Sequence, residues 1–525
     1  MSHASPPPAG RRASRIALTI IVGAIVVALL ALAISAYQRA HPAKAKVHVA
    51  SSISAKNVGV SAFLPLFGKG SPAGPARIGE ATIGLARNHG QTILMRLDQD
   101  ISWQLQTKTP LSACTTSPIT GQTFACLSSS TEGSRLLLVD ANTGKARWLF
   151  SMPTKAEAVA ALDGKILLAL PKGKYAQVDL NGELVSLPWP KDEPKANLCP
   201  TASATPITPN MAKTLGPNRV VVSVNGTVDV VEPNRVLLRS SGYPLLSGSD
   251  VYISPFPNSN RGAALIGGKV ADLPEHLVLP RTTDSHVPPV ALLDKVPHHF
   301  KNGKLGNPLF RADRAVFSGA PMFIAHNSAG LAMGVDAGLV QVGNDGHLDW
   351  KFEQPLAQGT ASRLGTLAVS KQGEVSVVKD GKATWTSPER VGDAPRLDTT
   401  QGRITVSGAG GQIVLAPGYG KTAKLTAPKV TKKIEGHAPL PAGSCVLVQR
   451  ISTESADVTM MKANCQVEGA QEILSVVTTD QVPRDADVDT LTDSCRVNRA
   501  ARTMISVQSS TYDPKVVAVC LAGSL

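Results

Sequence analysis

The longest apolar stretch of the chain lies near its start. Residues 16–36 read IALTIIVGAIVVALLALAISA, 21 residues without a charged side chain and with hydroxyls only at Thr19 and Ser35. As a helix with a rise of about 1.5 Å per residue, this stretch spans roughly 30 Å, the thickness of the hydrocarbon layer of a bilayer. It has no polar face, which a helix on the surface of a folded domain would need. The pattern predicts a single transmembrane helix over residues 16–36.

A cleaved signal peptide is the alternative, because the small residues Ala31, Ala33 and Ser35 resemble a cleavage site. The apolar run is longer than the roughly 7–15 residues of a signal peptide, which favours an uncleaved signal-anchor. Residues 1–15 form a basic tail with three arginines and no acidic residue. Such a tail before the first apolar segment is typical of a cytoplasmic N-terminus. We therefore expect a single-pass protein of the cell membrane whose C-terminal part is extracytoplasmic.

Beyond residue 76 the hydrophobic positions follow short strand-like runs, and one hairpin pattern recurs. Its clearest copy is SRLLLVDANTGKARWLF, residues 134–150. The side chains of Asp140 and Asn142 can bond to their own backbone in the turn, and Gly144 can supply the positive φ that closes it. Good copies recur at 93–105, 175–189, 338–352 and 374–387, and weaker ones at 227–238, 262–273 and 411–425.

All five tryptophans of the chain occupy the same place after this turn: Trp103, Trp148, Trp189, Trp350 and Trp385. A large ring at one fixed site per repeat indicates a repeated packing role, such as wedging one unit against the next. A second turn precedes most copies, and the repeats are about 40 residues long, which is typical of a β-propeller. The sequence predicts an all-β fold with seven to eight blades, whose repeats cover residues 76–428. Residues 429–525 alternate like strands without the turn motif, and form either the closing blade or blades or a cysteine-bridged β appendage.

The string DANTGKARW resembles the repeat of quinoprotein-like β-propellers, the group with PQQ-type repeats that includes the BamB-like proteins of the bacterial envelope. The resemblance implies a propeller in a membrane-anchored envelope protein and says nothing about activity, since the motif residues serve turns and packing. A quinoprotein dehydrogenase of this group would be expected to carry Ca²⁺ beside its quinone, and often two adjacent cysteines. This chain has no adjacent cysteines and no CxxCH haem motif.

Seven cysteines lie beyond the predicted anchor, and none belongs to a CxxC motif. Six fall into pairs that a hairpin could close, whereas Cys199 stands apart: the pairs are Cys114 with Cys126, Cys445 with Cys465, and Cys495 with Cys520. Buried thiols are the alternative. For an exported chain we favour at least two disulfides, although spacing alone does not fix their connectivity.

The distribution of charged residues is informative only near the predicted anchor. Of the net charge of +14, residues 37–80 contribute six bases against Glu80 alone, whereas residues 81–525 hold 44 bases against 38 acids. So small an excess over so long a segment disfavours nucleic-acid binding. Residues 37–75, rich in Ala, Ser, Gly, Pro and Lys, are interpreted as a flexible tether suited to anionic headgroups or wall polymer.

Motifs of catalysis are missing from the sequence, including GxSxG, HExxH, the P-loop and GxGxxG. The carboxylates Asp485, Asp487, Asp489 and Asp493 are spaced somewhat like a calcium loop. Thr490 and Arg496 stand where such a loop needs Gly and Glu, so we interpret the run as a solvated acidic loop.

The sequence thus favours a non-catalytic interaction or scaffold module of the cell envelope, with no cofactor and no metal. Its expected partners are the membrane and an envelope protein or cell-wall polymer. The alternatives are a PQQ-dependent quinoprotein oxidoreductase and a module that binds cell-wall polymer.

Overall fold

The computed structural model describes residues 47–523, apart from five longer gaps and scattered gaps of up to four residues; the longer gaps are 187–210, 255–261, 279–289, 310–322 and 451–457. The predicted tail 1–15 and anchor 16–36 lie outside the described residues, as do Trp189 and Cys199. In the part that is described, no helix has the length and apolar character needed to cross a bilayer.

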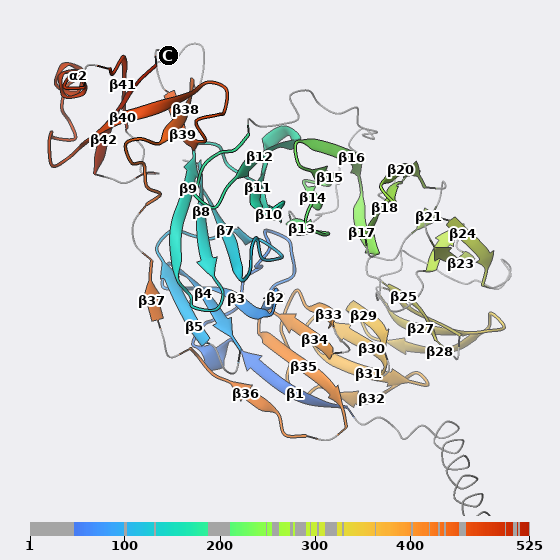
Figure 1. Ribbon diagram of the computed structural model, residues 1–525. Coiled ribbons are helices and arrows are strands. Elements are labelled where there is room, and N and C mark those ends of the chain that lie inside the picture. Colours follow the sequence, from blue (N-terminus) through green and yellow to red (C-terminus); the bar gives the residue numbers. More distant parts are fainter. Residues whose placement is uncertain are drawn as a thin grey trace, which may run out of the picture.

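Nearly all described elements are strands, and nine of their sheets follow one another in chain order around a ring (Figure 1). The first five sheets are built from β2 (Ala76–Ile78), β3 (Ala81–Asn88), β4 (Gln91–Leu97) and β5 (Ser102–Thr107); β6 (Ala113–Cys114), β7 (Thr123–Ser130), β8 (Gly133–Asp140) and β9 (Ala146–Met152); β10 (Ala158–Leu162), β11 (Lys165–Leu170) and β12 (Lys174–Val178); β13 (Met211–Thr214), β14 (Val220–Val224), β15 (Thr227–Glu232) and β16 (Arg235–Ser241); and β17 (Tyr243–Ser247), β18 (Asp250–Ser254), β19 (Ala263–Ile266) and β20 (Lys269–Asp272).

The other four are built from β21 (Leu277–Val278), β22 (Val290–Leu293), β23 (Val296–Lys301) and β24 (Lys304–Pro308); β25 (Phe323–Asn327), β26 (Gly330–Val335), β27 (Gly338–Gly343) and β28 (Leu348–Glu353); β29 (Leu356–Ser362), β30 (Gly365–Ser370), β31 (Val375–Lys379) and β32 (Lys382–Thr386); and β33 (Arg396–Thr400), β34 (Arg403–Gly408) and β35 (Gly411–Pro417) with β1 (Val47–Ser54). Each sheet is an antiparallel meander whose first strand lies nearest the middle of the ring (Figure 1). This arrangement is a β-propeller.

The described sheets outnumber the seven to eight blades expected from the repeats. The difference arises between residues 243 and 308, where β17–β20 and β21–β24 each complete a sheet. Only one weak hairpin copy, at 262–273, marks this region in the sequence, because neither sheet contains a tryptophan.

The ring is closed by the N-terminal strand. β1 pairs antiparallel with β35, from Val47 opposite Pro417 to Ser54 opposite Gly411. The expectation of a flexible tether over residues 37–75 is therefore wrong from Val47 onward. The segment after β1 includes the short 3-10 helix η1 (Lys56–Val58), and Phe63 is 2% exposed. Apolar side chains buried between sheets, rather than overall composition, decide that this segment folds.

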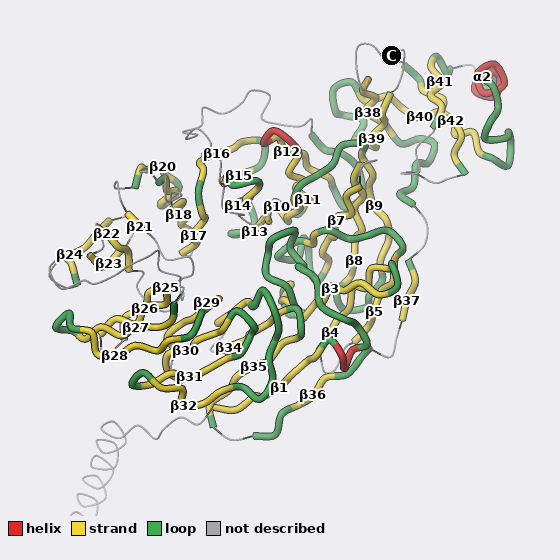
Figure 2. The backbone as a smooth tube through the Cα atoms, turned by 180° about the vertical axis from the view of Figure 1, so that it is seen from behind, coloured by secondary structure: helices red, strands yellow, loops and turns green. Residues whose placement is uncertain are grey.

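After β35 the chain runs along the outside of the ring. β36 (Ala423–Leu425) pairs parallel with β1, and β37 (Thr431–Lys433) pairs parallel with β5. Both strands lie on the outer rim in the front and back views (Figures 1 and 2). We call residues 423–433 the strap, because they fasten the ninth sheet to the first from outside.

The C-terminal residues form a separate five-stranded sheet beside the ring and do not close it (Figure 1). Its strands are β38 (Cys445–Arg450), β39 (Val458–Ala463), β40 (Ala470–Thr478), β41 (Thr503–Ser506) and β42 (Val516–Leu521), with the helix α2 (Val488–Arg496). The sheet docks on the ring through Leu184, whose backbone bonds to Lys462 and Asn464. Tyr512 adds a buried contact, since its hydroxyl donates to the carbonyl of Ser151 at 3.1 Å.

The remaining short element is the 3-10 helix η2 (Pro171–Gly173), which connects β11 to β12.

Adjacent sheets of the ring pack through apolar clusters. Between the first two sheets, Leu94 and Leu105 lie in one cluster with Phe124 and Leu137. The core is thus divided into wedges, one for each blade interface, as the propeller geometry requires.

Candidate functional site

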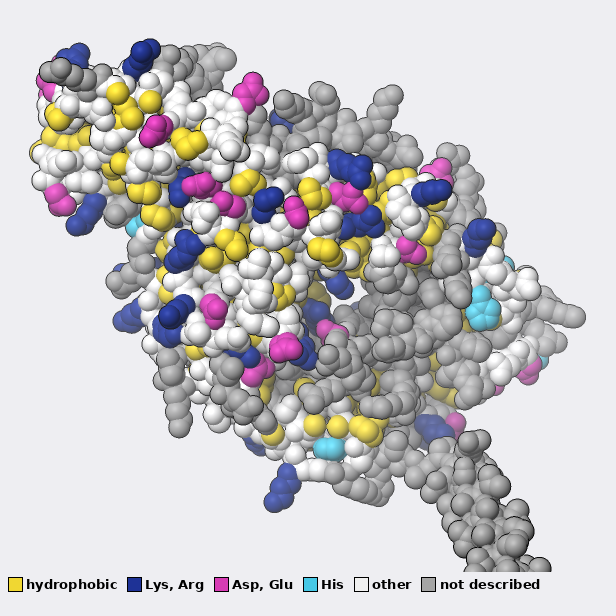
Figure 3. Space-filling view, in the orientation of Figure 1, with side chains coloured by type: hydrophobic (Ala, Val, Ile, Leu, Met, Phe, Trp, Pro, Cys, Tyr) yellow, Lys and Arg dark blue, Asp and Glu magenta, His cyan; other side chains and the backbone are white. Residues whose placement is uncertain are grey.

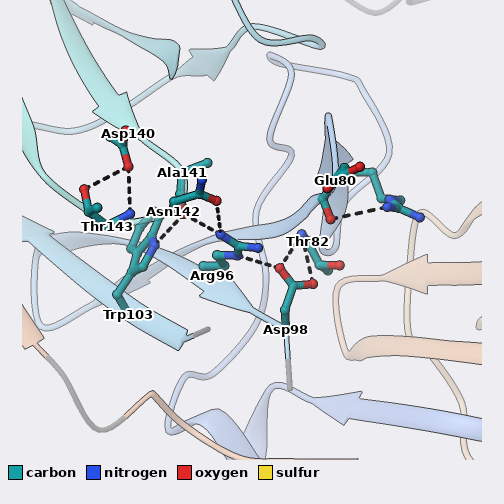
Figure 4. A network of polar contacts seen from close by, with 10 residues as sticks. Glu80, Thr82, Arg96, Asp98, Trp103, Asp140, Ala141, Asn142 and Thr143 are labelled. Atoms are coloured by element: carbon teal, nitrogen blue, oxygen red, sulfur yellow. Dashed lines mark hydrogen bonds and ion pairs between the residues drawn. The ribbon is translucent and has the colours of Figure 1, made fainter. Parts of the chain in front are cut away.

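The DANTG turn between β8 and β9 locks the second blade onto the first (Figure 4). The indole of Trp103, on β5, is 2% exposed, and its Nε1 donates to the carbonyl of Ala141 at 2.8 Å. Arg96 on β4 reaches the same carbonyl and the side chain of Asn142, both at 2.9 Å. Gly144 has φ of 62°, and a Cβ there would lie 2.7 Å from Cγ of Trp103. Glycine is therefore required both for the turn and for the close approach of the indole.

Asp140 holds the turn itself together. Its Oδ1 accepts hydrogen bonds from the backbone N–H and the hydroxyl of Thr143, at 2.7 and 2.8 Å. Burial acts to raise the pKa of Asp140, but the hydrogen bonds from Thr143 and from the backbone of Asn142 outweigh it, and the pKa lies below its usual range. The charged carboxylate is thus the form that stabilises the turn.

The other described tryptophans lie at comparable places with different degrees of burial. Trp148 is 4% exposed in the cluster between the first two blades. Trp350 is half-buried. A Cβ added to Gly381, in the turn of the next blade, would lie 3.3 Å from the Cβ of Trp350. Trp385 is half-buried against the cluster between the last two blades.

A second polar network is buried between the third and fourth blades. Arg239 on β16 contacts both carboxylate oxygens of Asp229 on β15, each at 2.7 Å, and Tyr175 on β12 donates to the same carboxylate at 2.5 Å. Arg239 also donates to the carbonyl of Gly173 at 2.8 Å. Burial raises the pKa of Tyr175 well above its usual value, with repulsion from Asp229 the second cause. The phenol therefore stays protonated and acts as a donor.

The six paired cysteines form three disulfides, Cys114–Cys126, Cys445–Cys465 and Cys495–Cys520. The first joins facing residues of β6 and β7, and the last ties α2 to β42. These are the pairs that sequence spacing favours.

The sequence suggested that the acidic run is a loop. In the structure much of the run instead lies in α2. Asp487 is the N-cap and accepts from the backbone N–H of Thr490 at 2.7 Å. Across the described ranges no group of three or more His, Cys, Asp or Glu side chains is placed to hold a metal ion.

Charged groups meet in the middle of the ring, where Figure 3 shows a hollow. Lys213 on β13 and the ion pair Arg396–Asp398 on β33 belong to blades far apart in chain order, yet they interact electrostatically. Loss of hydration lowers the pKa of Lys213, repulsion from Arg396 lowers it further, and Asp398 opposes both. Arg396 also lies over the ring of Phe67, 5.4 Å from its centre.

A cavity of about 480 Å³ adjoins this region at the interface of the ninth and first blades. We call it the seam cavity. Its wall includes Ser51 of β1, Arg77 of β2, Asp98 after β4, Arg396 of β33 and Thr405 of β34. Sequence reasoning missed it because its wall joins residues from both ends of the ring, and no local motif marks them.

Comparisons with known proteins add little to this picture. No family model matches the sequence, and no curated protein matches it. Among solved structures, BamB from Moraxella catarrhalis is 13% identical with a TM-score of 0.41, over 72% of this chain and 99% of that one. Sqt1 from Saccharomyces cerevisiae is 11% identical with a TM-score of 0.34, over 71% of this chain and 97% of that one. Likenesses this low carry no argument, so the β-propeller assignment rests on the ring of sheets itself.

Proposed function

We propose that this chain is a non-catalytic β-propeller held at the outer face of the cell membrane, where it presents its turns to another envelope protein. The observation that carries the proposal is the set of three disulfides. Disulfides persist in oxidising compartments and are rare in the cytosol of most organisms. They therefore support an extracytoplasmic domain, as does the apolar run at 16–36.

The connection between the proposed anchor and the ring is short. Only residues 37–46 separate Ala36 from β1. Even fully extended, they reach about 35 Å. On this proposal the propeller stays close to the membrane surface, and its protein partner lies within that reach.

Protease added to intact spheroplasts is expected to digest the domain beyond residue 46 and leave a small anchor fragment. Crosslinking in intact cells before extraction should then recover one defined partner protein with the full-length chain. Protection of the whole domain from the protease would reverse the topology. Recovery of wall polymer in place of a protein would select the wall-binding alternative.

The proposal also predicts no response to quinone. Pyrroloquinoline quinone with Ca²⁺ should leave the melting temperature of the purified protein unchanged, because only a ligand that binds the folded state raises it. No dye-linked oxidation of alcohols or sugars should follow. A reproducible rise in melting temperature together with such oxidation would establish the quinoprotein oxidoreductase instead.

A further inference from the structure

The seam cavity differs from the packed part of the same blade interface. At one end of the seam, Val58, Val60 and Phe63 fill the space against Met95 of β4. The other end is hollow, although β1 and the strap hold the two blades together there. A volume of about 480 Å³ is many times that of a water molecule and falls in the range of small-molecule sites.

Most charges on the cavity wall are paired. The wall carries two guanidinium groups, of Arg77 and Arg396, and two carboxylates, of Asp98 and Asp398. Arg396 and Asp398 form an ion pair at 3.3 Å. Asp98 accepts from Nε of Arg96 at 2.6 Å, beside the Glu80 carbonyl that accepts from Arg77 (Figure 4). With Arg96 counted, each carboxylate accepts from an arginine, and Arg77 is the guanidinium whose described contact is a carbonyl. A phosphate or a polyanion favours several converging cationic groups, so these paired charges suit a neutral ligand better.

The uncharged part of the wall has two kinds of surface. Hydroxyl groups come from the half-buried Ser51, Thr82 and Thr405. Apolar surface comes from the half-buried Val414, Ala416 and Leu425. A ligand with hydroxyl groups around its edge and C–H groups on its faces matches both kinds at once. A pyranose ring has this chemistry.

From this wall we infer that the seam cavity binds a neutral saccharide, with the hydroxyls of the sugar facing Thr405 and the Arg396–Asp398 pair. This inference goes beyond the proposed protein partner and does not depend on it. Loss of saccharide binding would leave crosslinking to an envelope protein unaffected, so the two proposals fail separately.

The test uses the full-length protein in detergent, with glucose, galactose, N-acetylglucosamine and maltose as probes and inorganic phosphate as the anionic comparison. Saturation-transfer NMR is expected to show binding of at least one sugar with a dissociation constant of about 1 mM or tighter. Thr405→Trp should fill the cavity and weaken that binding at least tenfold. Thr384→Trp, the same change at an exposed residue of β32 outside the cavity wall, should leave it unchanged.

If Thr405→Trp lowers the melting temperature, Ala50→Phe blocks the same cavity from β1 and is expected to give the same loss. The inference is overturned if no sugar binds the wild-type protein, or if binding survives both cavity-filling variants. Binding of phosphate that Thr405→Trp abolishes, without sugar binding, would also overturn it.

Discussion

Replacing Trp103 with alanine is expected to lower the free energy of unfolding by about 3–5 kcal/mol, because the change removes a buried ring and leaves a cavity between two blades. The indole is 2% exposed, packs under Gly144 and donates to Ala141. Removing it also leaves the Ala141 carbonyl with Arg96 as its remaining described side-chain donor. Urea denaturation of the wild-type and variant proteins measures the loss.

Trp385→Ala is the matched control, since Trp385 follows the same turn in its repeat but is only half-buried. Trp385→Ala should lower the free energy of unfolding clearly less than Trp103→Ala does. The loss of free energy of unfolding for Trp103→Phe should fall between those for Trp103→Ala and Trp385→Ala. Phenylalanine restores most of the buried ring but lacks the N–H donor. Equal losses for Trp103→Ala and Trp385→Ala would show that burial between blades is not what makes Trp103 important.

Asp229→Ala is expected to destabilise the protein by about 3–5 kcal/mol, because it leaves Arg239 charged and without its carboxylate in a buried site. The side chains of Arg239 and Asp229 are 8% and 4% exposed. Thermal unfolding of the variant should begin far below that of the wild type.

The combined change Tyr175→Phe, Asp229→Leu and Arg239→Met should recover at least half of that loss. It replaces the whole network by apolar groups and leaves no isolated charge. A triple variant as unstable as Asp229→Ala would indicate that shape, rather than the unpaired guanidinium, sets the cost.

The hairpin repeats could be predicted from sequence because their turn chemistry is local. Asp140, Asn142 and Gly144 stand within five residues of one another, and each has one physical role in the turn. The disulfide pairs were likewise suggested by short separations. Helix α2 also had a local signal that was overlooked: the N-cap Asp487, the acidic Asp489 in the first turn, and Leu491 four residues before Cys495 on the buried side.

The remaining features depend on contacts between distant parts of the chain. β1 looks like a small-residue linker by composition, and its pairing with β35 and β36, both remote in the chain, makes it a strand. The seam cavity has the same origin, since Ser51 and Thr405 meet only when the ring closes. The Tyr175–Asp229–Arg239 network joins two blades, and no local motif in either blade predicts it.

Ring closure by β1 sets the order in which this protein can fold during synthesis. Val47 pairs with Pro417, which lies 370 residues further along the chain and is therefore synthesised much later. Closing so long a loop costs only slightly more entropy than closing a shorter one, but contacts this remote form late. Until then, the edge of β35 that β1 will occupy offers unpaired backbone groups to any passing strand. We therefore expect the newly made chain to pass through an open-ring intermediate, with its most aggregation-prone stage at the end of synthesis rather than at the beginning.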